Sequence, residues 1–150
     1  IPTLQKMLPN FEFRQLRVSP RPNETLEDFN ARKQDIYVSA DMFLQVANSE
    51  GFSYASQDAM ACGLVPVCTN VGAFYGDVPQ ECFESLDWEK CYGDSVDYEY
   101  IKEGILRGWQ RRISIASKAR EWYLENTTFS RWSETMTNMV RDFGDIQYSS

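Results

Sequence analysis

The feature that most constrains the fold is a run of three segments between residues 40 and 68. Residues 40–47 form an apolar stretch of strand length, residues 53–62 are rich in small side chains at helical spacing, and residues 64–68 are again apolar and strand-like. A strand, a helix and a second strand in this order predict a β-α-β crossover with parallel strands. Because parallel strands need helices packed on the sheet, the pattern predicts an α/β fold.

Composition limits the number of domains and the classes of partner. The 150 residues, of which 43% are hydrophobic and 14% aromatic, are enough for one compact domain, so we expect a single unit over residues 1–150. The net charge of -7 argues against a nucleic-acid partner, since phosphate backbones favour clustered Lys and Arg. No nucleic-acid binding is therefore expected.

Histidine is absent from the sequence, which excludes Ser-His-Asp and Cys-His hydrolase chemistry. The four cysteines, Cys62, Cys68, Cys82 and Cys91, show no Cys-x-x-Cys spacing, so no thiol-based metal site is expected. Apolar runs surround Cys62 and Cys68, and we expect buried free thiols in a reducing compartment.

The rest of the chain predicts a helix and two short strands before the C-terminal helices. We expect a short strand at residues 11–16, a helix over 26–39 with Thr25 as its N-cap and Asp28 three positions on, and a last short strand at 82–86. Three helices are expected within residues 98–143, at 98–109, 111–125 and 130–143. A stripe at helical spacing on the last of them predicts a core-facing surface; its members are Phe129, Trp132, Met136, Met139, Val140 and Phe143.

Chemistry is concentrated where the first strand of the crossover meets the helix. Glu50 lies in the loop after the strand, where its carboxylate can point into the crevice above the sheet. Gly51 allows close backbone approach, and the helix that starts near Ser53 offers unpaired N–H groups suited to a phosphate. Asp58 falls one turn past Tyr54, so its carboxylate can accept ribose hydroxyls. This arrangement predicts a sugar-nucleotide site.

Over residues 35–75 the chain resembles the donor-binding half of retaining glycosyltransferases of the GT-B fold, the glycosyl transferases group 1 family. That family carries Glu-Gly-Phe-Gly, a few residues, and then Glu-Ala-Met-Ala-x-Gly-x-Pro-Val. This chain has Glu-Gly-Phe-Ser at 50–53, Asp-Ala-Met-Ala-Cys-Gly at 58–63 and Pro-Val at 66–67. The resemblance implies a Rossmann-like parallel sheet with flanking helices, forming the C-terminal, donor-binding domain of such an enzyme.

The resemblance also implies site residues. Glu50 is implied to be catalytic, acting toward the donor sugar, and Asp58 to bind the ribose. The donor-binding set implied by the family is Gly51, Phe52, Ser53, Tyr54, Asp58, Gly72 and Ala73, with no metal ligand and no cofactor beyond the nucleoside-diphosphate sugar. The chain departs from the family pattern in having Asp58 for a longer Glu, Ser53 for Gly, and Val46-Ala47 for Pro-Ser.

Expectations about the whole protein follow from the same resemblance. The family's basic phosphate-binding pair comes from an earlier segment that has no counterpart here, and the chain opens on Ile1, so we expect it to be part of a longer protein. The partners implied are a nucleotide-sugar donor, a glycan, lipid or protein acceptor, and an N-terminal acceptor domain of the same protein. We expect a cytoplasmic location, with any contact to the cytoplasmic membrane face made by that domain.

Three functions stay open at this point. The first is metal-independent transfer of a sugar to an acceptor hydroxyl with retention of configuration. The second is a nucleotide-sugar epimerase, which would need extra acid-base residues that the sequence does not display. The third is a noncatalytic interaction module derived from the same fold, which the changes at Ser53 and Asp58 keep open. Donor binding separates the first two from the third.

Overall fold

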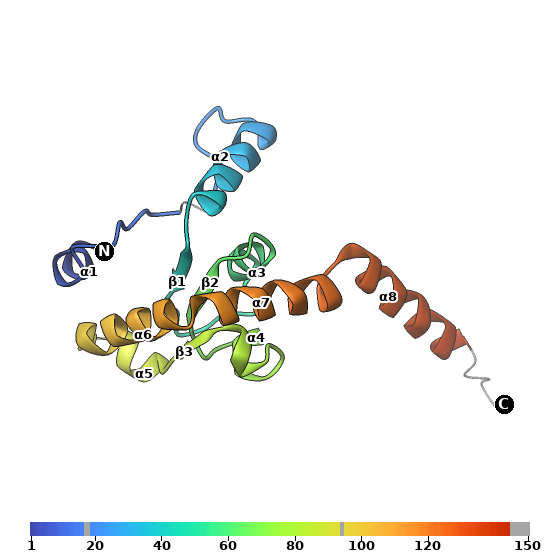
Figure 1. Ribbon diagram of the computed structural model, residues 1–150. Coiled ribbons are helices and arrows are strands. Elements are labelled where there is room, and N and C mark those ends of the chain that lie inside the picture. Colours follow the sequence, from blue (N-terminus) through green and yellow to red (C-terminus); the bar gives the residue numbers. More distant parts are fainter. Residues whose placement is uncertain (17–18, 94, 145–150) are drawn as a thin grey trace.

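A computed structural model describes residues 1–16, 19–93 and 95–144 of the chain (Figure 1). Its centre is a parallel sheet of three strands in the order β1-β2-β3. These strands are β1 (Met42–Gln45), β2 (Val65–Thr69) and β3 (Glu84–Leu86). Helix α3 (Tyr54–Ala61) joins β1 to β2, which pair in parallel with Leu44 opposite Val67. The predicted β-α-β crossover and the α/β class are confirmed, in a form compatible with a Rossmann-like fold.

Helices before and after the sheet account for most of the remaining chain. They are α1 (Pro2–Met7), α2 (Leu26–Val38), α4 (Ala73–Gly76), the 3₁₀ turn η1 (Gln80–Cys82), α5 (Trp88–Cys91), α6 (Tyr98–Gln110), α7 (Arg112–Asn126) and α8 (Phe129–Gly144). The helices predicted within residues 98–143 are therefore confirmed as α6, α7 and α8. No helix within the described ranges is long and apolar enough to cross a membrane.

One face of the sheet packs against α6 and α1. Val67 and Leu86 of the sheet are fully buried in this cluster with Ile105 of α6. Two glycines let α6 lie close to the strands: a Cβ at Gly104 would stand 2.3 Å from Leu86 Cδ2, and one at Gly108 would stand 3.0 Å from Met42 Cε. The backbone of α6 therefore approaches the sheet where most side chains would hold it away.

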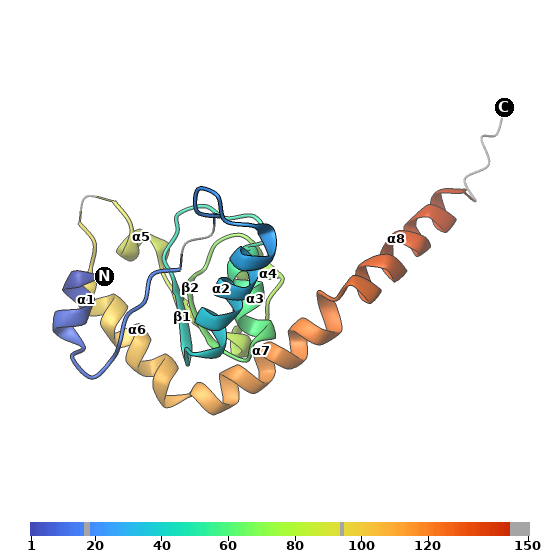
Figure 2. The same cartoon turned by 90° about the horizontal axis from the view of Figure 1, so that it is seen from above.

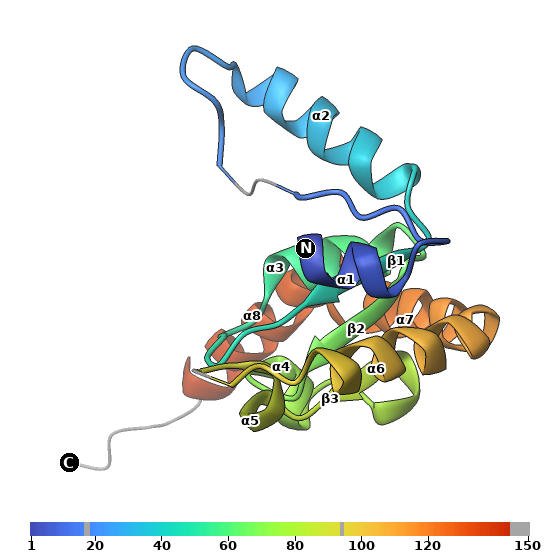
Figure 3. The same ribbon diagram turned by 90° about the vertical axis from the view of Figure 1, so that its left-hand side faces the viewer.

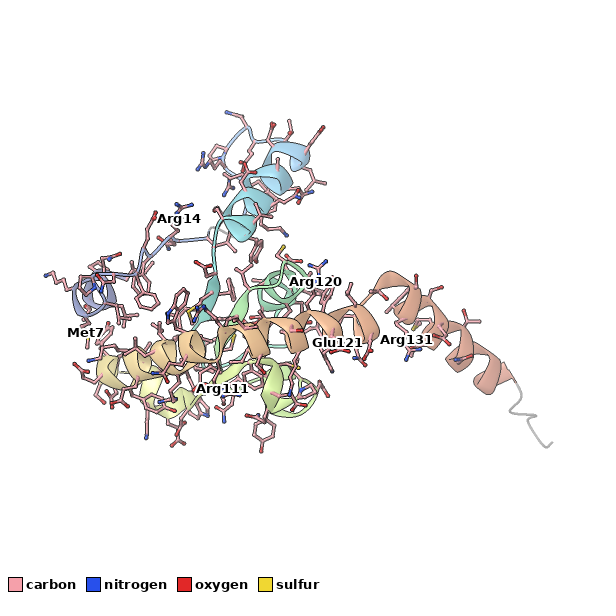
Figure 4. The ribbon with its side chains drawn as sticks, in the orientation of Figure 1. Met7, Arg14, Arg111, Arg120, Glu121 and Arg131 are labelled. Carbon is pink, nitrogen blue, oxygen red and sulfur yellow. The ribbon has the colours of Figure 1, made fainter. Side chains whose placement is uncertain are left out.

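The opposite face packs against α3, α4 and α7. Met60, Cys68, Phe74 and Phe83 are buried there, with Ala119 of α7. Figure 2 shows α7 continuing directly from the end of α6. The end of α3 is also tied to α7, because Nη1 of Arg120 (labelled in Figure 4) donates to the carbonyl oxygen of Ala61 at 2.5 Å.

The strand predicted at residues 11–16 is wrong, because this segment is irregular. The side chain of Gln5 bonds it instead: Nε2 donates to Phe11 O at 2.7 Å, and Oε1 accepts from Phe13 N at 3.2 Å. The Phe11 ring packs edge-on against Trp109, with centroids 5.6 Å apart. Alternating aromatics in this segment thus serve contacts with α1 and α6 rather than a sheet.

Helix α2 stands outside the sheet layers and reaches them through its C-terminal half (Figure 3). Its predicted cap is confirmed, since Thr25 Oγ1 accepts from the amide of Asp28 at 3.1 Å. Tyr37 is 2% exposed, and its hydroxyl donates to Ala55 O of α3 at 2.8 Å. The Tyr37 ring also lies 5.9 Å from that of Phe43 in β1. These contacts fix one face of α2 against α3.

The core-facing stripe predicted for the last helix is wrong at the two residues whose side chains the structure describes. Figures 1 and 2 show α8 extending away from the sheet. Trp132 is 58% exposed and Met136 39% exposed. A helical repeat of apolar residues identifies an amphipathic face but not what covers it. The side chains of Phe129, Met139, Val140 and Phe143 lie outside the described residues.

Candidate functional site

Two loops lie side by side at the carboxyl ends of β1 and β2. The amide of Ala73 donates to Gly51 O at 3.0 Å, which joins the loop after β2 to the loop after β1. Gly72 has φ +58, and a Cβ there would lie 2.3 Å from Gly51 O and 2.4 Å from Glu50 O. Only glycine fits, on both conformational and steric grounds. The structure therefore brings Gly72 and Ala73 to Glu50 and Gly51, as the predicted site requires.

Thr69, the last residue of β2, fixes the start of the loop after β1. Its side chain is buried, and Oγ1 donates to Ala47 O at 2.7 Å while accepting from Ala47 N at 3.0 Å. Two bonds to one residue give that backbone a single orientation as it leaves the sheet. The start of the loop that carries Glu50 is therefore held in place at Ala47.

Gln45, the last residue of β1, forms hydrogen bonds with several side chains of the site. Its Nε2 donates to Glu50 Oε1 at 2.7 Å. Its Oε1 accepts from Ser53 Oγ at 2.7 Å and from Ser56 Oγ. Ser53 is 6% exposed and Ser56 is fully buried, so these hydroxyls need an acceptor inside the protein. One amide side chain thus fixes both the Glu50 carboxylate and the first turn of α3.

Glu50 itself is exposed, with one carboxylate oxygen held by Gln45. Among the described residues, its Oε2 has no hydrogen-bond donor. The small hollow beneath it is lined by Gln45, Glu50, Ser53, Cys68, Thr69, Val71 and Phe74 and is too narrow to hold a water molecule. A ligand of Glu50 must therefore lie on the exposed surface above this hollow.

The start of α3 presents unpaired backbone donors next to Glu50. Ser53 precedes the helix with φ +56, and its carbonyl accepts from Ser56 N at 3.0 Å and Gln57 N at 3.1 Å. In the part of the chain that the structure describes, the amides of residues 52–55 make no hydrogen bond. Such amides, together with the helix dipole, favour an anion. The exposed rings of Phe52 and Tyr54 pack edge to face beside them, with centroids 5.5 Å apart.

Asp58 lies farther along α3 and is paired with a lysine of α2. Lys33 Nζ is 2.8 Å from Asp58 Oδ2, and both side chains are partly exposed, Lys33 at 28% and Asp58 at 39%. The predicted position of Asp58 one turn past Tyr54 is confirmed, since both belong to α3. Its ion pair with Lys33 was not predicted.

The cysteines divide into one exposed and three buried free thiols. Cys62 is exposed, so its predicted burial is wrong; it follows the last residue of α3, where the chain turns outward. Cys68 lies under the site, 3.7 Å from Ser56 Oγ, and burial raises the pKa of its thiol to about 12. A thiol with this pKa stays protonated and is a poor nucleophile. Cys68 is therefore part of the core.

Gln45, Thr69 and Lys33 are the site residues that the sequence analysis missed. A polar Gln at the end of the apolar segment Met-Phe-Leu-Gln was a signal, because an amide side chain that ends a strand next to the core needs hydrogen-bond partners. Thr69 at the end of the next strand gave a similar signal. Lys33 gave none, since 25 positions separate it from Asp58.

Comparisons with protein-family models, with curated proteins and with solved structures find no match to this chain. The geometry of the two loops and of α3 therefore carries the functional argument, and the family resemblance remains a prediction. Among the described residues, no group of three or more Cys, Asp or Glu side chains is arranged to hold a metal ion.

Proposed function

We propose that this chain is the donor-binding part of a retaining, metal-independent glycosyltransferase. In this reaction a sugar leaves its nucleoside diphosphate and joins an acceptor hydroxyl. The observation that carries the proposal is the position of Glu50, held by Gln45 at 2.7 Å beside the unpaired amides at the start of α3. Parallel sheets bind ligands at this edge, outside the carboxyl ends of the strands.

The diphosphate is assigned to the amides of residues 52–55. Negative charge grows on the diphosphate as the bond to the sugar breaks, and fixed donors that already point at the site stabilise that charge without reorganising. The dipole of α3 acts in the same direction, since its positive end lies here. These residues can therefore support departure of the nucleotide through backbone groups alone.

Glu50 is assigned to the donor sugar. With Oε1 accepting from Gln45, its Oε2 is left to accept from a sugar hydroxyl and to stabilise positive charge at the anomeric carbon. Gly72 supports this role, because any side chain at its position would collide with the Glu50 and Gly51 carbonyl oxygens and displace the loop. Ala73 acts through its own amide, which is bonded to Gly51 O and so holds the loop rather than the donor.

The other half of the reaction needs an acceptor and residues that orient it. We propose that a glycan, lipid or protein hydroxyl is the acceptor and that an N-terminal acceptor domain of the same protein presents it.

Asp58 is assigned to the ribose of the donor, one helical turn beyond the amides that bind the diphosphate.

A noncatalytic interaction module is the second candidate, and two observations favour it. The hollow under Glu50 has no room for a water molecule, and one oxygen of Asp58 is already bound to Lys33. A module of this kind would retain the loops as a surface for a partner without turning over a nucleotide sugar.

A donor screen separates the two candidates. The full-length protein is incubated with UDP, GDP and dTDP sugars, and nucleotide release is measured with and without a mixture of acceptor alcohols. Transfer predicts release from one donor class, lowered about 100-fold or more in Glu50→Ala, because a charge-stabilising group is lost. Glu103→Ala, which alters an exposed acid on α6, is the matched control and should keep the wild-type rate. No release from any donor would favour the module.

A further inference from the structure

We propose that Lys33 is a second ribose-binding residue, which acts with Asp58 to recognise the vicinal 2′,3′-diol of the donor nucleotide. This inference rests on the proposed function, since it concerns the same nucleotide. The observation behind it is the 2.8 Å contact between Lys33 Nζ and Asp58 Oδ2, which brings a residue of α2 to the binding face of α3.

The position of Lys33 is fixed by its helix. Tyr37 lies one turn after Lys33 in α2, and its buried hydroxyl donates to Ala55 O in α3. Lys33 itself contacts Asp58, which lies about one turn after Ala55 in α3. Arg32, the residue before Lys33, pairs at 2.8 Å with Glu24, which lies just before the start of α2. Contacts on both sides of Lys33 therefore set where its ammonium group lies.

The hydrogen-bonding groups of the pair are only partly used. An ammonium group has three N–H donors, and in the described residues the only acceptor bonded to Lys33 Nζ is Asp58 Oδ2. Asp58 Oδ1 likewise has no donor among these residues. Because both side chains remain partly exposed, the pair offers a ligand an acceptor and a donor next to each other.

A vicinal diol matches this arrangement, because each of its hydroxyls can both donate and accept. One hydroxyl donates to Asp58 Oδ1 while its neighbour accepts from Lys33 Nζ. A carboxylate without an ion-pair partner could accept from both hydroxyls through its two oxygens. Here Asp58 Oδ2 already accepts from Lys33, so Lys33 Nζ binds the second hydroxyl in place of Oδ2. Phosphate fits less well, since the carboxylate largely cancels the attraction of the ammonium for an anion.

Nucleotides that lack one hydroxyl provide the test. Isothermal titration of the full-length protein compares UDP and GDP with their 2′-deoxy and 3′-deoxy forms. In the wild type, each deoxy form of the nucleotide that binds should bind roughly tenfold more weakly, the loss of one hydrogen bond to a charged group. In Asp58→Ala, the hydroxyl that donates to Asp58 Oδ1 loses its partner while Lys33 keeps the other hydroxyl, so discrimination against one deoxy form should disappear and discrimination against the other should remain. The double variant Asp58→Ala/Lys33→Met should lose both discriminations.

Control variants distinguish a ribose role from a structural one. Lys33→Arg keeps a donor and should retain both discriminations, and Lys6→Met, at an exposed position on α1, should match the wild type. Thermal melting checks that each variant is folded, and Lys33→Gln replaces Lys33→Met if the latter unfolds. Loss of both discriminations in Asp58→Ala alone, or equal weakening of this variant toward all forms of the nucleotide, overturns the role of Lys33 alone. A wild type that binds neither UDP nor GDP overturns the proposed function itself.

Discussion

Gln45 Nε2 donates to Glu50 Oε1 at 2.7 Å, so the last residue of β1 fixes the orientation of the acid in the loop that follows it. The same amide accepts from Ser53 and Ser56 at the start of α3. A single side chain therefore couples the proposed sugar-binding acid to the proposed diphosphate-binding helix. This coupling makes Gln45 a positioning residue.

Replacement of Gln45 with Leu should lower both stability and transfer. It removes the oxygen that accepts from the buried Ser56 hydroxyl and leaves Ser53 only Ser56 Oγ as an acceptor, which should reduce the free energy of unfolding by about 1–3 kcal/mol. Glu50 also loses its only protein donor among the described residues, so the proposed transfer should slow in protein that is still folded. Urea unfolding followed by circular dichroism, combined with nucleotide release, measures both. A folded Gln45→Leu protein that releases nucleotide at the wild-type rate would contradict the positioning role.

Gly72→Ala should be among the most damaging small changes in the chain. The new Cβ would lie 2.3 Å from Gly51 O in a backbone conformation at φ +58, so we expect a loss of about 2–4 kcal/mol in unfolding free energy. Gly76→Ala is the matched control, because a Cβ there meets nothing within 4 Å and lies in α4; its effect should stay within about 1 kcal/mol. Equal effects of the two changes would argue against the close approach of the two loops.

Gln57→Met should stabilise the protein. Gln57 is 3% exposed, and neither Nε2 nor Oε1 has a hydrogen-bond partner among the described residues. Replacing an unpaired buried amide with an apolar side chain of similar length should raise the free energy of unfolding by about 1–2 kcal/mol. Chemical denaturation provides the measurement. A loss of stability would show that the amide has a partner, such as a buried water.

The contacts of Glu24, just before α2, should make the stability of the protein fall in acid. Arg32, through its hydrogen bond, and the amide of Arg21 lower the pKa of Glu24 from 4.5 to about 2. A pKa lowered by folding means that this contribution is fully present above pH 4.5 and is lost as the pH falls toward 2. Urea midpoints recorded between pH 5 and pH 2 should fall less steeply in Glu24→Gln than in the wild type.

Glu27→Gln serves as the control for that titration, because Glu27 is an exposed acid in the first turn of the same helix. Its midpoints should follow the wild type throughout the range. If Glu24→Gln follows the wild type equally closely, the link between Glu24 and the acid sensitivity of α2 is wrong.

Local sequence patterns were enough to predict the crossover and the cap of α2. Apolar runs of strand length around a helix of small residues specify β1, α3 and β2, and Thr25 bonds the amide of Asp28 only three positions away. The same reasoning failed at residues 11–16, where a strand would need a neighbouring strand and the chain instead bonds to Gln5. Alternation of side chains shows which of them are buried but not what buries them.

Some candidate site residues could likewise be predicted from local patterns, and others could not. The positions of Glu50 and Asp58 in the fold could be predicted because their spacing reflects a single loop and helix. Lys33 and Asp58 meet only because α2 packs on α3, a long-range contact that no local pattern encodes. Exposure of Trp132 on α8 is likewise a tertiary property, since it depends on where α8 lies relative to the sheet.

The most direct test of the central claim is an NMR titration of the ¹⁵N-labelled protein with UDP and with GDP, which follows every backbone amide. If the start of α3 binds the diphosphate, one nucleotide should produce saturable shifts that are largest at the amides of residues 52–55, with smaller changes near Glu50 and Asp58. Saturable shifts centred elsewhere, or no shifts with either nucleotide at millimolar concentration, would contradict the account.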